Sequence, residues 1–184
     1  HECERKAGRM IPLYAPNLNV DEALVNLRDA LQANWIGRTG KFVTEFEQKV
    51  AEFLGADPAR CVLTSSCSAS LWLALKILRP GLVITAPVSF AATATIPQLL
   101  DSTPYATDSA SPRSLQMLVG GPMTRAGAYI PVAWAGWLPD LARLKHQVGR
   151  ERVILDAAQA FGAKFEDRPL HEYAAFVTYS FGAI

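Results

Sequence analysis

The sequence predicts an α/β fold, a three-layer αβα arrangement around a mainly parallel sheet. Two observations lead to this prediction. First, short apolar runs alternate along the chain with stretches of helical periodicity, which is the order of elements in parallel sheets with helical connections. Second, the apolar runs are nearly continuous, as expected for strands that helices cover on both faces.

The N-terminal part is predicted to contain two helices. Residues 21–34 carry apolar residues three and four positions apart and acidic residues in the first turn. Residues 43–55 repeat the apolar pattern up to a stop at Gly55. The glycines between the two helices predict a loop over residues 35–41.

From Cys61 onward, five apolar runs are predicted strands and three segments between them are predicted helices. The strands are 61–64, 82–85, 128–132, 152–156 and 174–180, and the helices are 68–78, 90–100 and 138–148. The segment 103–125 is rich in Ser, Pro and Gly, and its one helical candidate is 113–118.

The composition is that of a globular protein with one sizeable domain. Half of the 184 residues are hydrophobic, and the formal net charge is +1 without a basic run. Neither a nucleic-acid partner nor a membrane-spanning segment is therefore predicted. Three widely spaced cysteines without a CxxC motif predict no disulfide framework and no metal site, which favours a cytoplasmic location. Residues 1–10 are predicted to be a flexible lead-in, and residues 11–184 one large domain.

Polar residues at the carboxyl ends of the predicted strands are the candidates for a site, because open parallel sheets bind ligands there. The segment TSSCSAS, residues 64–70, places Ser66, Cys67 and Ser68 at a predicted helix start. Free N–H groups and the helix dipole attract a phosphate at such a position. The alternative is that one serine only caps the helix, and the pattern alone leaves both open.

Asp156 ends a predicted strand, and Gln159 follows three positions later. This carboxylate is placed to meet a cationic group of a ligand, and both side chains would face the same way if Ala157 opened a helical turn. The alternative is that Asp156 caps that turn. Phe90 also follows a predicted strand and could lie against a planar ligand, although its periodicity alone favours the core.

Six segments share their order and spacing with a known family. They are NWIGRTGKFVTEFEQKVAEFLGA, LTSSCSASLWLALKIL, APVSFAATATI, IPVAWAG, LDAAQAFGA and YSFGAI. Through them nearly the whole chain, from Ile11 to Ile184, resembles the large domain of the DegT/StrS-type sugar aminotransferases. These are pyridoxal 5'-phosphate enzymes with the aspartate aminotransferase fold.

The resemblance implies a role for each candidate residue. Asp156 would pair with the protonated ring nitrogen of the cofactor, Phe90 would stack on its ring, and Gln159 would lie near its 3-hydroxyl group. The serines and Cys67 would bind its phosphate. The full cofactor-binding set would be Ser66, Cys67, Ser68, Phe90, Asp156, Gln159 and Ser180, and the substrate-binding set Trp35, Gly37 and Thr39.

The chain departs from the family pattern at three places. Ala133 stands where the family commonly has a histidine, and the segment 108–125 is shorter than its family equivalent. The Schiff-base lysine of the family follows the SFxxx element directly, so it is expected just after Ile184. The chain is therefore expected to be a fragment without the catalytic lysine and the small C-terminal domain, and to have no transaminase activity alone.

The resemblance implies a transaminase that converts a keto-sugar nucleotide to an amino sugar, with glutamate as the donor, and that acts as a homodimer. A sugar dehydratase of the same family, with histidine at the lysine position, is one alternative. A non-catalytic remnant that binds a phosphate-bearing ligand or a partner subunit is another. A flavodoxin-like phosphate binder would require the six segments to match by chance.

Overall fold

The computed structural model describes residues 19–34, 37, 39–111, 114–118 and 126–182. The lead-in predicted over residues 1–10 lies outside the described residues. The chain divides into two compact units, one spanning His1–Thr44 with Ala183–Ile184 and the other spanning Glu45–Gly182. The first unit holds α1 (Val20–Gln32), α2 (Lys41–Leu54) crosses the boundary, and the second unit holds the sheet.

The two N-terminal helices are confirmed. Asn19 caps α1 through its Oδ1, which accepts the Glu22 N–H at 3.3 Å, and acidic residues at 21 and 22 complement the helix dipole in the first turn. α2 ends before Gly55, whose φ of +63° places it in the left-handed region. Glycine adopts this conformation without strain, so the predicted stop is also confirmed.

Five parallel strands form the sheet of the second unit. Their spatial order is β2 (Thr103–Ala106), β1 (Leu82–Thr85), β5 (Ala128–Ile130), β6 (Ile154–Asp156) and β9 (Phe176–Thr178). Bridges between Tyr129 and Val153 and between Val132 and Asp156 join β5 to β6. The predicted parallel sheet is therefore confirmed.

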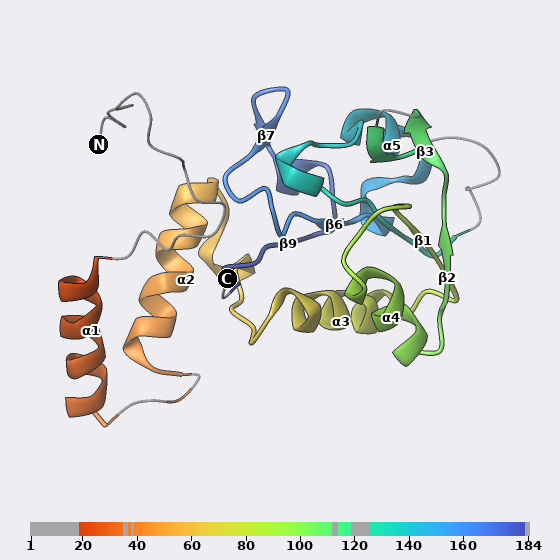
Figure 1. Cartoon of the computed structure of the whole chain (residues 1–184). Coiled ribbons are helices and arrows are strands. Elements are labelled where there is room, and N and C mark those ends of the chain that lie inside the picture. The colour runs from red at the N-terminus through yellow and green to blue at the C-terminus, as the bar shows by residue number, and fades with distance from the viewer. Residues whose placement is uncertain (1–18, 35–36, 38, 112–113, 119–125, 183–184) are drawn as a thin grey trace, which may run out of the picture. The chain divides into compact units, whose positions relative to one another are not determined.

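Helices cover both faces of this sheet. On one face, α3 (Cys67–Leu78) and α4 (Ala92–Leu99) pack on alternate residues of the strands, with Leu71 and Leu75 in the core. On the other face, α5 (Leu141–Val148) packs on the intervening residues of the same strands. Figure 1 shows α3 and α4 on one side of the strands and α5 on the other. The three predicted layers are thus present.

The winding direction of the sheet reverses between β1 and β5. From β1 the chain passes through α4 to β2, whereas β5, β6 and β9 are added on the other side of β1. The connecting helices change faces at the same point, as right-handed crossovers require. Ligands of doubly wound sheets bind beyond the carboxyl ends of the strands near such a reversal, so a site is expected at the ends of β1, β5 and β6.

The strand predicted over residues 61–64 is wrong. This segment is irregular, because Val62 is 72% exposed and the Leu63 N–H donates to the Glu47 carboxylate at 2.9 Å instead of to a neighbouring strand. A short apolar run without a partner strand does not extend the sheet.

The helix predicted over residues 113–118 is also wrong. There β4 (Ser114–Met117) pairs antiparallel with β3 (Ser109–Ser111), and Met117 is buried. The strand β2 was not predicted because it contains Pro104. Proline is tolerated at this position since β2 lies at the edge of the sheet.

Short elements connect the larger ones. They are η1 (Pro58–Arg60), η3 (Trp134–Gly136), η4 (Arg150–Arg152), η5 (Leu170–Glu172) and the hairpin of β7 (Lys164–Phe165) with β8 (Arg168–Pro169). None of the helices in the described part of the chain combines the length and apolar character needed to cross a membrane.

We expect Gly127→Ala to destabilise the protein and Gly81→Ala to be tolerated. A Cβ added at Gly127 would lie 2.8 Å from Pro80 Cβ and 2.9 Å from Pro80 Cα, whereas one added at Gly81 meets nothing within 4 Å. Because the backbone of Pro80 cannot rotate away, the first substitution should lower the free energy of unfolding by about 1–3 kcal/mol. The second should leave it unchanged or raise it by up to about 1 kcal/mol. Urea unfolding midpoints compare the two variants, and equal midpoints would contradict the close approach at Pro80.

Candidate functional site

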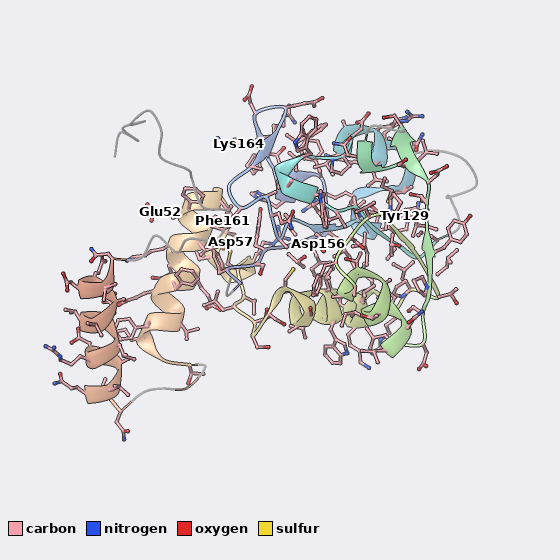
Figure 2. The ribbon with its side chains drawn as sticks, viewed as in Figure 1. Glu52, Asp57, Tyr129, Asp156, Phe161 and Lys164 are labelled. Atoms are coloured by element: carbon pink, nitrogen blue, oxygen red, sulfur yellow. The ribbon has the colours of Figure 1, made fainter. Side chains whose placement is uncertain are left out.

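The carboxyl ends of β6 and β9 and the starts of α3 and α4 meet around Asp156. Asp156 is the last residue of β6, and it is only 5% exposed. Side chains alternate between the two faces of a strand, so Asp156 shares its face with Ile154, which packs on the same side of the sheet as α3. Figure 2 labels Asp156 in the region where the end of β6 and the start of α3 come together.

Three donors from different segments contact the Asp156 carboxylate. The Ala158 N–H donates to Oδ1 at 3.1 Å, and the Thr93 hydroxyl donates to Oδ2 at 3.3 Å from the first turn of α4. The Cys67 thiol, at the first position of α3, lies 3.9 Å from Oδ1. The contact with Ala158 is the turn cap that the sequence left as an alternative, but capping requires neither of the other two contacts.

Burial raises the pKa of the Asp156 carboxyl above its ordinary value, and the hydrogen bonds from Ala158, Thr93 and Cys67 oppose this rise. No Lys or Arg within the described ranges forms an ion pair with this carboxylate. A cationic group of a ligand placed beside it would stabilise its ionised form.

The start of α3 provides the second part of the site. Ser66 is the N-cap, and its Oγ accepts the Ala69 N–H at 3.2 Å, so Ser66 has the capping role that the sequence left open. Cys67 and Ser68 occupy the first two helical positions, whose N–H groups have no acceptor within a helix. These two N–H groups and the Ser68 hydroxyl can bind an anion at the positive end of the helix dipole.

Phe90 and Ser180 both follow the carboxyl end of a strand, Phe90 after β1 and Ser180 after β9. The ring of Phe90, two residues before α4, is 72% exposed, so the alternative that it belongs to the core is wrong. Thr178 pairs in register with Asp156, and Ser180 follows two residues later. The Ser180 Oγ accepts the Gly182 N–H at 3.1 Å.

Gln159 and Asp156 contact different segments. Two short turns, and no α-helix, follow Asp156. The Gln159 Oε1 accepts the Ala135 N–H at 2.6 Å. The buried Ala133 donates its N–H to the Asp156 carbonyl at 2.8 Å. The position where the family commonly has a histidine is therefore adjacent to Asp156.

Aromatic contacts support the two segments that carry Gln159 and Ser180. The ring centroid of Phe161 lies 5.2 Å from that of Phe53, 5.4 Å from that of Tyr179 and 5.0 Å from that of Phe181. These contacts connect α2 to the turn after β6 and to the segment after β9.

The predicted substrate-binding residues belong to the other unit. Trp35 lies outside the described residues. Gly37 and Thr39 are exposed and precede the boundary at Thr44, so their role stays a prediction.

Two buried threonines near Asp156, Thr93 and Thr178, were not predicted from the sequence. Both are at most 4% exposed. Thr178 ends β9 as Asp156 ends β6, so the rule of polar residues at strand ends would have found it. Thr93 carries no comparable signal, because its partner is 63 positions away in the sequence.

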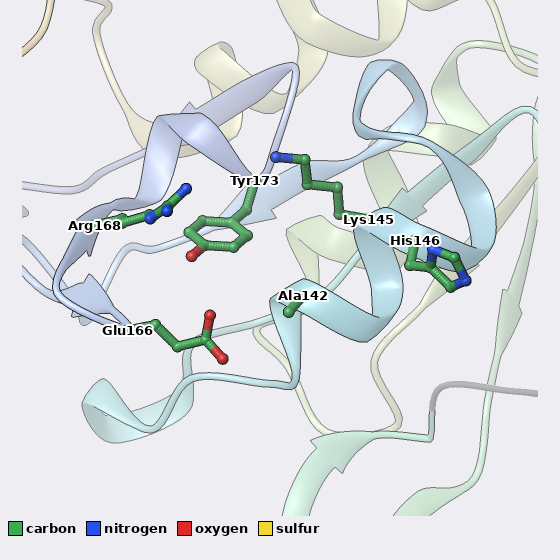
Figure 3. A pocket seen from close by; sticks show the side chains of 6 residues that line it. All are labelled: Ala142, Lys145, His146, Glu166, Arg168 and Tyr173. Carbon is green, nitrogen blue, oxygen red and sulfur yellow. The ribbon is translucent and has the colours of Figure 1, made fainter.

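An open pocket of about 670 Å³ lies elsewhere, beside α5 and the β7–β8 hairpin (Figure 3). Two of its charged side chains contact Glu172, which does not line the pocket. Lys145 Nζ donates to the Glu172 carbonyl at 3.0 Å, and Arg168 forms an ion pair with Glu172 at 3.6 Å. None of the candidate residues around Asp156 lines this pocket, so it supports no part of the site.

We expect the Cys67 thiol to react slowly with alkylating reagents. Burial, together with the adjacent Asp156 carboxylate, raises the pKa of Cys67 to about 11. At pH 8 only about one thiol in a thousand would be ionised, against roughly a quarter for a free cysteine. Iodoacetamide should therefore modify Cys67 at least about tenfold more slowly than glutathione in a variant with Cys3→Ser and Cys61→Ser. Asp156→Asn should speed the reaction, because it removes a charge that raises the thiol pKa. Equal rates for Cys67 and glutathione would contradict this environment.

Comparisons with known proteins point to one family. The DegT/DnrJ/EryC1/StrS aminotransferase family matches residues 18–184. The chain is 28% identical to spore coat polysaccharide biosynthesis protein SpsC of Bacillus subtilis, a match that covers 97% of this chain and 47% of SpsC. It is also 28% identical to the dTDP-4-amino-4,6-dideoxy-D-glucose transaminase of Escherichia coli, covering 94% and 47%. The chain thus spans about half the length of these curated relatives.

Solved structures have the same fold. The sugar aminotransferase CalS13 from Micromonospora echinospora is 30% identical, with a TM-score of 0.78 over 95% of this chain and 50% of CalS13. The putative sugar aminotransferase Spr1654 from Streptococcus pneumoniae, in its PLP-form, is 23% identical, with a TM-score of 0.77 over 95% and 49%.

Proposed function

Because this chain belongs to the DegT/DnrJ/EryC1/StrS aminotransferase family, we propose that it is the cofactor-binding part of a pyridoxal 5'-phosphate aminotransferase that acts on a keto-sugar nucleotide. The observation that carries this proposal is the proximity of a helix start to a buried carboxylate. Cys67, the first residue of α3, lies 3.9 Å from Asp156.

The residues present fit this cofactor. Its phosphate requires N–H and hydroxyl donors, which Cys67 and Ser68 offer at the start of α3, with Ser180 at the same edge of the sheet. Its ring nitrogen requires a carboxylate shielded from water, and Asp156 is 5% exposed. Its ring requires an apolar surface, which the exposed ring of Phe90 can supply.

Bound pyridoxal 5'-phosphate supplies the electron sink for transamination. Asp156 would hold a proton at the ring nitrogen, because the buried carboxylate is ionised most favourably beside a cation. The N–H groups of Cys67 and Ser68 would hold the phosphate at the positive end of the α3 dipole. Gln159, whose Oε1 accepts the Ala135 N–H, still has its NH₂ group to donate toward the 3-hydroxyl.

The names of the relatives support the substrate class. A transaminase that is 28% identical is named for a dTDP-linked amino sugar, and a protein that is 26% identical is a GDP-perosamine synthase. We propose a keto-sugar nucleotide as the acceptor and glutamate as the donor, with Trp35, Gly37 and Thr39 on the sugar side. We further propose a cytoplasmic homodimer, and a lysine directly after Ile184 as the residue that bonds the cofactor and moves the substrate proton.

The test is to express the complete gene and to incubate the purified protein with pyridoxal 5'-phosphate, glutamate and a panel of dTDP-, UDP- and GDP-linked keto-sugars. The expected result is a cofactor-dependent visible absorption band and an amino-sugar nucleotide identified by mass spectrometry. Loss of the sugar oxygen without gain of nitrogen would assign the dehydratase reaction instead. Absence of pyridoxal 5'-phosphate binding would overturn the proposal.

A further inference from the structure

The Thr93 hydroxyl donates to a side chain of a different segment and not to a carbonyl of its own helix. Helical threonines commonly donate to a carbonyl three or four residues earlier. Thr95, on the same helix, does so, since its Oγ1 donates to the Ala91 carbonyl at 3.0 Å. Thr93 instead donates across to the Asp156 Oδ2 at 3.3 Å, and it is 0% exposed.

The contacts with Asp156 divide between its two oxygens. Oδ1 faces the Ala158 N–H and the Cys67 thiol, whereas the contact with Oδ2 comes from Thr93. The Ala158 contact is local, because it belongs to the turn that begins at Asp156. The Thr178 hydroxyl donates to the Leu155 carbonyl and does not replace Thr93. Rotation of the carboxylate about its last bond is therefore opposed at Oδ2 by Thr93.

We infer that Thr93 is a positioning residue, which holds the Asp156 carboxylate in the orientation that meets the ring nitrogen of the cofactor. This inference rests on the proposed function. It assigns Thr93 no contact with the cofactor. Thr93 would act through Asp156, so its effect should be limited to ligands that present a nitrogen to that carboxylate.

The experiment separates positioning from general structural support. The protein from the complete gene and its variants Thr93→Val and Thr93→Ser are titrated with pyridoxal 5'-phosphate and with its carbocyclic analogue, in which a C–H group replaces the ring nitrogen. Valine keeps the shape of threonine without the hydroxyl, and serine keeps the hydroxyl. Thr95→Val is the matched control, because it removes a hydroxyl from the same helix away from Asp156.

Thr93→Val is expected to weaken the binding of pyridoxal 5'-phosphate about tenfold, since a hydrogen bond to a charged group is lost. Binding of the analogue should change by less than about twofold, because it offers no nitrogen to Asp156. Thr93→Ser and Thr95→Val should both bind the cofactor as the parent does. If Thr93→Val does not fold, Thr93→Ala, which places no methyl group against the carboxylate, should show the same difference between the two ligands.

Each other outcome has a definite meaning. Equal weakening for both ligands would overturn the inference, because a structural defect does not distinguish a ring nitrogen from a carbon. Cofactor binding at the parent level in Thr93→Val would overturn it as well, while leaving the proposed function intact. If the parent binds neither ligand, the proposed function fails and the inference fails with it.

Discussion

Replacing Asp156 with asparagine is expected to abolish transamination in the protein from the complete gene. Asparagine keeps the shape of the side chain but cannot pair with a protonated ring nitrogen. Loss of one partner of a buried charge pair costs about 3–5 kcal/mol, which corresponds to a rate loss of about a hundredfold to several thousandfold. Steady-state rates with glutamate and the accepted keto-sugar nucleotide measure this loss.

The same variant is expected to be at least as stable as the parent at pH 7 without ligand. Burial raises the pKa of the Asp156 carboxyl in the folded protein above that in the unfolded chain. The folded state therefore binds the proton more tightly, and ionisation destabilises it as the pH rises from the unfolded pKa through the folded pKa. Asparagine carries no such penalty. The free energy of unfolding of the variant, measured in urea, should therefore equal that of the parent near pH 3 and exceed it most above the folded pKa.

Asp140→Asn is the matched control for both measurements. Asp140 caps α5 by accepting the Arg143 N–H at 2.9 Å, and asparagine caps helices equally well. Its activity and stability should match the parent. Activity at the parent level in Asp156→Asn would contradict the proposed role of Asp156.

Leu71→Ala is expected to lower the free energy of unfolding by about 2–5 kcal/mol, because it opens a cavity in a close-packed core. Leu71 is 1% exposed and lies on α3, one turn after Cys67, in the core cluster that also contains Ile154. The substitution should also weaken cofactor binding, since this core holds the start of α3 against β6. Urea unfolding and cofactor titration measure the two effects.

Leu73→Ala provides the comparison on the same helix. Leu73 is 42% exposed, so its truncation should change the free energy of unfolding by only about 0.5 kcal/mol. Similar losses of unfolding free energy in Leu71→Ala and Leu73→Ala would contradict the assignment of Leu71 to the face of α3 that packs on the sheet.

The central strands could be predicted because burial on both faces leaves a direct trace in the sequence. β1 and β6 are continuous apolar runs that end in one polar residue. The edge of the sheet leaves no such trace, and β2 combines Pro104 with the 62% exposed Tyr105. The segment 61–64 shows the opposite failure, because an apolar run becomes a strand only where a partner strand is present.

Part of the candidate site could be predicted from local sequence. Asp156 follows an apolar strand, and the hydroxyl-rich segment before α3 marks a helix start. The groups that orient Asp156 were not predictable, since Thr93 donates to it only because the fold brings α4 to the end of β6. Local sequence also could not show that Gln159 would bond to Ala135, which belongs to η3.

The contacts of Asp156 join residues that are far apart along the chain. Cys67 and Thr93 precede it by 89 and 63 positions. At a synthesis rate of about 5–20 residues per second, the starts of α3 and α4 are made several seconds before Asp156. Contacts of such sequence separation form late in folding, because the loop must close first. The carboxylate is therefore buried only when β6 joins the sheet, and a ligand that binds there stabilises the completed unit and none of its precursors.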